Sequence, residues 1–334
     1  MRRVAFILIA LLGVCLNLVA QESDSTSLRP TFGVNFTAEM QTDFKNVRYA
    51  NLLELHADIP LSRSLSFQAS SLSAMNSRDD LDILDLQGFS NIDTPNMPFA
   101  LAVAGFSWHP NDRHSLFAGI RRTDEDYFCS EGLSLFTNSS CGIFPTSSYN
   151  SLVACYPNAA LGVHYAYDHK NLCLQASLYN GIGNNKFNGR YNVFRFCPKS
   201  DGVMAIGQAE YRYRNSHYYL GGIMHSKENI SSSVWAYAEQ SLSPRLTLLA
   251  AYGHAFGSKL CDNFCALGAT YKYKRAEFGL FSDYTRIVYM DEWATELICS
   301  LRLTDILTVK PVLHVITTNG ETKCIGMLRM DIGI

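Results

Sequence analysis

The chain has 334 residues, a formal net charge of −2, 12% aromatic residues and 17% charged residues. This charged fraction is below the ~25% that is usual in soluble domains. The near-neutral charge and the absence of a long basic run in the sequence argue against nucleic acid as a partner.

The first predicted element is a secretory signal peptide over residues 1–20. Arg2 and Arg3 precede an apolar run that ends in small residues, as in exported proteins. Removing it takes away two of the 28 Lys and Arg and none of the 30 acids, which leaves a net charge of −4. A lipoprotein signal at Cys15 fits less well because Val14 is larger than the residue usually expected there. A transmembrane anchor fits less well because the apolar run is shorter than the ~20 residues that a span needs.

Alternating apolar and polar residues then follow along the whole mature chain, 21–334, which we expect to form a single domain. Phe32, Val34 and Phe36 alternate with Asn35 and Thr37, the pattern of a strand with one apolar face. The same pattern predicts about sixteen strands, near residues 31–44, 48–61, 65–75, 100–109, 115–121, 158–168, 172–181, 202–214, 217–226, 231–241, 246–256, 261–274, 276–286, 292–304, 307–318 and 324–334.

The connections between these strands alternate in length. Even-numbered ones are short and polar, such as "SRS", "HPNDRH" and "DHKN", whereas odd-numbered ones include long intervals at 76–99, 122–157 and 182–201. Outer-membrane barrels with an even strand count have short periplasmic turns and long external loops. The sequence therefore predicts an all-β transmembrane antiparallel barrel in a bacterial outer membrane. A soluble β-sandwich is the alternative, but it has no reason to segregate loop lengths.

The final stretch, "ETKCIGMLRMDIGI" at 321–334, also alternates. Leu328, Met330 and Ile332 lie on one face, and Arg329 and Asp331 lie on the other. We expect this last strand to pair with the first, because unpaired amides in lipid cost several kcal/mol each.

In a membrane barrel the apolar row faces lipid and the polar row faces the lumen. Both signs of charge occur in the polar row, which predicts a wet polar channel instead of a packed core. The side chains predicted to point inward are Glu39, Glu54, His56, Arg121, His164, Gln175, Gln208, Glu210, Arg212, Lys272, Glu296, Arg302 and Lys310.

The cysteines leave the disulfide pattern open. Nine remain after removal of the signal peptide, an odd number. Cys129 with Cys141, and Cys261 with Cys265, could bridge within loops in an oxidising periplasm. The spacings match no zinc motif, and we expect neither a metal nor another cofactor.

Several stretches resemble the carbohydrate-selective outer-membrane porins, the OprB-like family. They are "DLQGFSNID" at 85–93, "LFTNSSCGIFP" at 135–145, "YPNAALGVHYAY" at 156–167, "LQASLYNG" at 174–181 and "ELICSLRLTDILTVKPVLHVI" at 296–316. The resemblance implies a sixteen-stranded barrel, often a homotrimer, that lets small sugars diffuse across the outer membrane. It also implies that the long loop at 122–157 folds into the channel and narrows it.

The entrance of this loop carries the densest mixed-charge cluster in the chain. Arg121 and Arg122 are followed by Asp124, Glu125 and Asp126. Opposed acids and bases at a constriction would create a transverse field and offer hydrogen bonds to hydroxyl groups, as charged rings do in channels. The alternative is a solvated loop whose charges pair locally and contribute little.

Two further polar groups are candidates for the pore lining. Glu210 and Arg212, with Arg214, would contact sugar hydroxyls or anchor loop 122–157 to the wall by ion pairs. Another group is predicted to form one cross-strand network near the seam of the barrel: Glu39, Glu54, Glu296 and Arg302.

Aromatic rings bind sugars by lying against the apolar face of a pyranose. Tyr179, Phe136, Phe144 and Trp108 are candidates for such platforms, although rings of this kind often belong to loop packing or to the interfacial girdle. For Trp108, beside the predicted turn "HPNDRH", we favour the girdle.

Catalysis finds little support, because no nucleophile elbow of the G-x-S-x-G kind marks a serine enzyme. We expect a passive porin and not an enzyme. The main alternative is a non-conducting barrel used for adhesion or envelope structure, with a plugged lumen.

Overall fold

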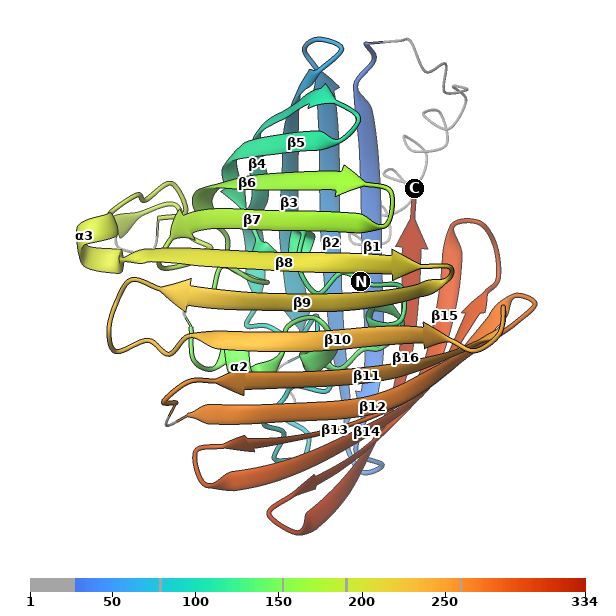
Figure 1. Ribbon diagram of the computed structural model, residues 1–334. Helices are drawn as coiled ribbons and strands as arrows, with labels where there is room; N and C mark the ends of the chain where they lie inside the picture. The colour runs from blue at the N-terminus through green and yellow to red at the C-terminus, as the bar shows by residue number, and fades with distance from the viewer. Residues whose placement is uncertain (1–27, 78–79, 152, 190–191, 259) are drawn as a thin grey trace.

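The computed structural model describes residues 28–334 except 78–79, 152, 190–191 and 259. Its sixteen antiparallel strands follow one another around a closed barrel (Figure 1), which confirms the predicted fold class. Each predicted strand overlaps one of them. The bounds are β1 (Thr31–Thr42), β2 (Val47–Pro60), β3 (Leu65–Asn76), β4 (Met97–Asn111), β5 (His114–Arg121), β6 (Ala160–His169), β7 (Leu172–Asn180), β8 (Val203–Tyr213), β9 (Ser216–His225), β10 (Ser233–Ser241), β11 (Leu246–Ala255), β12 (Cys261–Tyr273), β13 (Ala276–Ile287), β14 (Met290–Arg302), β15 (Leu307–Thr318) and β16 (Glu321–Gly333).

The seam between β1 and β16 closes the barrel. Glu39 lies opposite Arg329 in the antiparallel register. Val34 and Ile334 exchange two backbone hydrogen bonds, at 2.9 and 3.0 Å. The predicted pairing of the last strand with the first is therefore confirmed.

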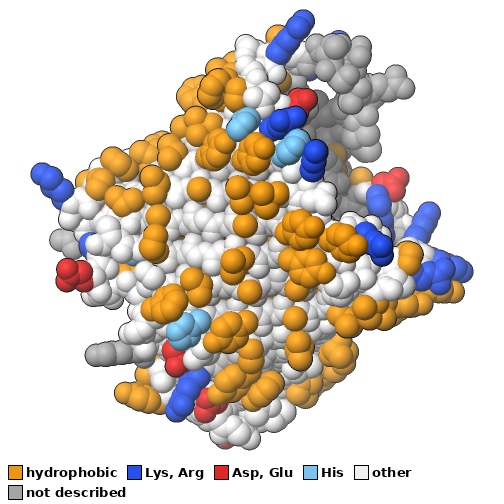
Figure 2. Space-filling model, viewed as in Figure 1, with side chains coloured by type: hydrophobic (Ala, Val, Ile, Leu, Met, Phe, Trp, Pro, Cys, Tyr) orange, Lys and Arg blue, Asp and Glu red, His pale blue; other side chains and the backbone are white. Residues whose placement is uncertain are grey.

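The outward face of the barrel is apolar, as predicted. Phe32, Leu178 and Leu267 point outward with exposed fractions of 63%, 52% and 69%, and hydrophobic side chains spread over the visible outer wall in Figure 2. Among the described helices, none is both long and apolar enough to cross a membrane.

The two ends of the barrel differ in their connections. We call one the short-turn end, formed by turns 61–64, 112–113, 170–171, 214–215, 242–245, 274–275 and 303–306. The opposite, long-loop end carries the three long connections, 77–96, 122–159 and 181–202. The third of these contains α3 (Pro198–Asp201) and extends to the side in Figure 1.

The connection 122–159, which we call the inner loop, folds into the barrel. It contains η1 (Thr123–Glu125), η2 (Leu133–Leu135), η3 (Ser139–Cys141) and α2 (Pro145–Ser148). Helix α2 lies against β10, β11 and β12. Phe128, Phe136 and Phe144 are buried, so the inner loop is a packed element of the lumen.

This packing corrects the prediction of a lumen lined throughout by polar groups. Trp235 packs on Phe128 with ring centroids 4.5 Å apart, and Phe281 packs on Phe136 at 5.1 Å. The inner faces of β10 and β13 are apolar at these points because they meet the inner loop and not water. Alternation alone does not predict these apolar inner faces, because its interpretation assigns apolar side chains to the lipid-facing side only.

Two further predictions concern the signal peptide and the cysteines. The signal peptide over 1–20 lies outside the described residues. The proposed disulfides are absent, because all nine cysteines after residue 20 are free. Cys261 is buried and Cys265 is exposed; the irregular register between Cys261 and Phe264 separates their faces.

Candidate channel and its constriction

A cavity of about 570 Å³ remains in the lumen beside the inner loop. The inner loop and residues 91–93 bound one side of it, and strands β1, β2 and β16 bound the other. Its lining includes four carboxylates and two arginines: Glu54, Asp93, Asp124, Glu131, Arg122 and Arg329. Charged side chains from both sides therefore line part of the space that the inner loop leaves open.

Arg122 is the basic group that the inner loop contributes. Its Nε donates to Glu125 Oε1 at 2.9 Å. The same guanidinium lies 3.6 Å from Glu54 and 3.8 Å from Asp124. Burial alone would lower the pKa of Arg122, but the three carboxylates outweigh it and raise the pKa above its usual value, so this side chain stays positively charged.

Asp124 is the acidic partner on the same turn. Burial raises its pKa, while Arg122 opposes this shift. Its Oδ1 accepts a hydrogen bond from the Tyr156 backbone N–H at 3.2 Å. Asp124 in η1 and Arg122 directly before it therefore lie beside each other, 3.8 Å apart.

Arg121 faces a different partner and does not line the cavity. Its Nε and Nη2 donate to the Asp126 carboxylate, both at 2.6 Å. Its guanidinium carbon lies 4.8 Å from the centroid of the Phe117 ring. His164 Nδ1 lies 3.5 Å from the same carboxylate. Arg121 therefore ties the start of the inner loop to the wall formed by β5 and β6.

Glu39 and Arg329 form the charged pair of the seam. Arg329 Nε donates to Glu39 at 2.6 Å, and its Nη2 donates to Asn91 Oδ1 at 2.6 Å. Ser90 Oγ also donates to Glu39 at 2.6 Å. Sequence reasoning missed Arg329, although it lies opposite Glu39 in the strand pairing that was predicted correctly.

Glu296 holds the inner loop and does not line the cavity. It accepts hydrogen bonds from the backbone N–H groups of Thr137, at 2.8 Å, and Asn138, at 3.0 Å. Glu239 accepts one from Gly132 N–H at 2.7 Å. Such charge-assisted bonds to backbone are among the stronger ones in proteins, so carboxylates of the wall fix the backbone of the loop.

The connection 77–96 is held in the same way. Glu292 accepts hydrogen bonds from the N–H groups of Leu86 and Gln87 at 2.7 and 3.0 Å. Asp85, one residue earlier, accepts from Gly88 and Phe89 at 2.9 and 2.6 Å. Burial, together with the negative charge of Glu292, raises the pKa of Asp85 to about 6.

Glu210 and Arg212 do not anchor the inner loop, contrary to one of the two predictions for them. Glu210 bonds to His217 Nδ1 at 2.7 Å. Arg212 donates to Asp168 at 2.6 Å. Both partners belong to neighbouring strands near the short-turn end, and Arg214 lies in the turn itself.

The predicted network of Glu39, Glu54, Glu296 and Arg302 is also wrong. Glu54 faces Arg122, whereas Arg302 donates to Asp305 at 3.2 Å near a short turn. The four residues were grouped by strand, but they lie at different heights along the barrel and bind separate partners.

Three of the four aromatic candidates are packing residues. Tyr179, Phe136 and Phe144 are at most 1% exposed, so none offers a free ring face to a sugar. Trp108 is 47% exposed and lies on the strand that leads to turn 112–113, as expected for the interfacial girdle.

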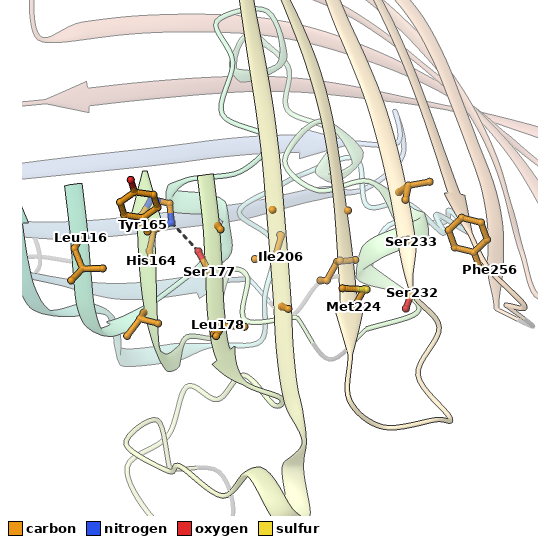
Figure 3. Close-up of a pocket in the computed structure, with 17 residues that line it drawn as sticks. Leu116, His164, Tyr165, Ser177, Leu178, Ile206, Met224, Ser232, Ser233 and Phe256 are labelled. Carbon is orange, nitrogen blue, oxygen red and sulfur yellow. Dashed lines mark hydrogen bonds between the residues drawn. The ribbon is translucent and has the colours of Figure 1, made fainter. Parts of the chain in front are cut away.

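A larger apolar groove, of about 840 Å³, lies on the outer wall of the barrel (Figure 3). Small residues on its floor leave a depression between outward side chains such as Leu178 and Met224. The hydrogen bond between His164 and Ser177, 2.8 Å long, lies behind it. This groove faces away from the lumen and is separate from the candidate channel.

Solved porin structures resemble this chain, whereas comparisons of the whole sequence find no match. No known protein family matches the sequence, and no curated protein sequence matches it. The high-pH structure of OprB from Pseudomonas putida has a TM-score of 0.77 and 14% identity, over 91% of this chain and 94% of that one. The low-pH structure of the same protein has a TM-score of 0.62 and 14% identity, over 91% and 92% of the two chains.

A variant of the Rhodobacter blastica porin also matches, with a TM-score of 0.60 and 10% identity, over 92% of this chain and 100% of that one. At such identities the likeness concerns the fold. The resemblance to OprB-like porins that the sequence indicates is therefore confirmed at the level of fold.

Proposed function

We propose that this protein is a porin of the bacterial outer membrane, through which carbohydrates or similar small polar solutes diffuse passively. The observation that carries the proposal is the charged cavity between the inner loop and strands β1, β2 and β16. A lumen that only needed filling would have no reason to keep six charged side chains around an open space, since buried charges are costly.

The fold supports this proposal. Its structural neighbours are OprB and another porin, and its unequal ends match outer-membrane barrels with short turns in the periplasm and long loops outside. The choice of sugars, and assembly as a homotrimer, follow from the sequence resemblance alone. We assign no catalytic role to the chain.

The cavity would select solutes by its fixed charges. Arg122 and Asp124 come from the inner loop, and Glu54 and Arg329 come from the wall that faces them. A neutral sugar would exchange hydrogen bonds with both signs of charge and be released again, as conduction requires.

A non-conducting envelope barrel is the second candidate, and the packing of the inner loop favours it. Phe128, Phe136 and Phe144 pack against the inner wall, so the inner loop closes much of the lumen. Under this alternative, the remaining cavity would not connect the two ends of the barrel.

Solute entry into liposomes separates the two candidates. Glucose, a disaccharide and an amino acid of similar size to glucose would be compared for the native chain, for Arg122→Gln and for Arg195→Gln. Arg195 is a matched control because it also pairs with an acid, Asp201 at 2.7 Å, but lies in connection 181–202.

We expect glucose to enter faster than in empty liposomes, and only Arg122→Gln to change the ratio of glucose to disaccharide entry. If folded protein admits none of the three solutes, the envelope barrel is the correct function.

A further inference from the structure

Basic side chains surround the short-turn end of the barrel. Six of its seven turns carry at least one Lys or Arg, and all seven turns together hold seven bases against two acids, Asp112 and Asp305. In Figure 2, Lys and Arg gather along the edge where the turns after β8, β10 and β12 lie. We call these seven side chains the basic collar: Arg63, Arg113, Lys170, Arg214, Arg245, Lys274 and Arg275.

The collar has no carboxylate partners among the described residues. All seven side chains are exposed, and none lies within ion-pairing distance of a described acid. At the long-loop end, by contrast, Lys45 and Lys323 both pair with Asp82, at 3.8 and 3.0 Å. The collar thus presents uncompensated positive charge.

Turn geometry does not explain these bases. Lys170, Arg214 and Lys274 have φ angles of 56°, 56° and 55°, in the left-handed region that glycine adopts more easily. Each is the first residue of a two-residue hairpin turn, where glycine would lower the conformational cost. The turns therefore hold basic side chains at positions that disfavour them.

Two members of the collar lie on aromatic rings that face outward. The guanidinium carbon of Arg214 is 5.3 Å from the Tyr213 centroid, and Lys274 Nζ is 5.4 Å from the Tyr273 centroid. Tyr213 and Tyr273 are 49% and 47% exposed. Outward tyrosines at strand ends mark the boundary between the lipid tails and the headgroups, so the collar lies at headgroup level.

We propose that the basic collar binds the headgroup phosphates of anionic phospholipids in the leaflet at the short-turn end. This inference rests on the membrane placement in the proposed function, but not on conduction. Long basic side chains extend from the apolar wall to the headgroups. Each base near an anionic leaflet strengthens the binding of anionic lipid roughly fivefold. An annulus enriched in anionic lipid would also fix the depth and orientation of the barrel.

The test measures lipid preference at the protein boundary. The barrel is reconstituted in phosphatidylcholine membranes that contain spin-labelled phosphatidylglycerol or spin-labelled phosphatidylcholine, and electron paramagnetic resonance gives the immobilised fraction of each. We expect the native chain to favour phosphatidylglycerol roughly fivefold, and the preference to fall as salt screens the charges.

The variant Lys170→Gly, Arg214→Gly and Lys274→Gly removes three collar charges while easing the three turns. This variant is expected to fold as well as the native chain and to lose most of the preference for phosphatidylglycerol. A matched control removes three bases at the long-loop end, as Lys45→Gln, Lys199→Gln and Lys227→Gln, and is expected to keep it.

Three outcomes would overturn the proposal. Equal preference for phosphatidylglycerol in the native chain and the collar variant would show that the collar does not bind anionic lipid. An equal loss in the control would assign the effect to net charge. Displacement of the labelled lipid by millimolar inorganic phosphate at constant ionic strength would indicate a site for free anions. Solute entry, measured in pure phosphatidylcholine liposomes, reports on the porin function independently.

Discussion

Glu296 shows how a single side chain positions the inner loop. It is 1% exposed and accepts hydrogen bonds from two backbone N–H groups, of Thr137 and Asn138. The sequence indicated an inward carboxylate on this strand, but it could not show that the partner is a backbone turn 158 residues away in the chain. Contacts of this range depend on the path of the loop, which local patterns do not encode.

We expect Glu296→Ala to release the inner loop. Each buried N–H that loses its acceptor costs about 1–3 kcal/mol, so the thermal midpoint should fall and the ionic current in planar bilayers should rise. Glu296→Gln keeps one acceptor oxygen and should lie between. Exposed Glu321→Ala is the control, and an unchanged midpoint in Glu296→Ala would contradict this role.

Asp85 predicts a pH dependence of connection 77–96. Its pKa of about 6 in the folded chain exceeds the ~3.9 of an unfolded aspartate. Protonation of Asp85 therefore stabilises the folded connection. This stabilisation is complete below about pH 4 and is lost as the pH rises through 6.

We expect hydrogen exchange at the Gly88 and Phe89 amides, corrected for intrinsic rates, to accelerate about tenfold between pH 5 and 7. Asp85→Asn should remove this dependence, whereas Asp82→Asn, exposed in the same connection, should retain it. Equal pH profiles for the native chain and Asp85→Asn would contradict the assignment.

At the scale of elements, alternation located the strands, whereas the entry of the inner loop into the barrel was implied by the family resemblance and its packing was not predicted. Alternation is local, so every strand could be located from residues such as Leu174 and Gln175. The same rule failed on the inner faces of β10, β12 and β13, where Trp235, Phe264 and Phe281 are buried. These rings are dry because another segment of the chain covers them, which is a tertiary effect.

Gly221 controls how β9 and β10 support the inner loop. A Cβ atom there would lie 2.3 Å from the ring of Trp235, which itself packs on Phe128. We expect Gly221→Ala to displace this ring and to cost about 1–3 kcal/mol through overpacking. Urea unfolding and the tryptophan emission maximum would measure it. Gly207→Ala, with its nearest atom at 3.4 Å, is the control and should change neither.

At the scale of the whole molecule, fixed charge differs along the barrel axis. The cavity lining holds four carboxylates and two arginines, whereas the basic collar surrounds the short-turn end. The sequence indicated charge in the pore, but not its sign, because Asp93 and Glu131 lie in connections whose course it does not determine.

We expect the channel to favour cations over anions because acids outnumber bases in the cavity. The reversal potential in a potassium chloride gradient would show this, most clearly at low ionic strength, where screening is weak. Glu54→Gln with Glu131→Gln should reduce the cation preference. An anion preference in the native chain would mean that the collar and not the cavity governs ion entry.

The central claim is that solutes pass between the inner loop and strands β1, β2 and β16. Thr37 lines this cavity, and Leu328 points outward from the adjacent strand with 43% exposure. In a cysteine-free background, single-channel current would be recorded for Thr37→Cys and Leu328→Cys before and after labelling with a bulky thiol reagent. We predict a reduced current for labelled Thr37→Cys only. An unchanged current through fully labelled Thr37→Cys would contradict the account.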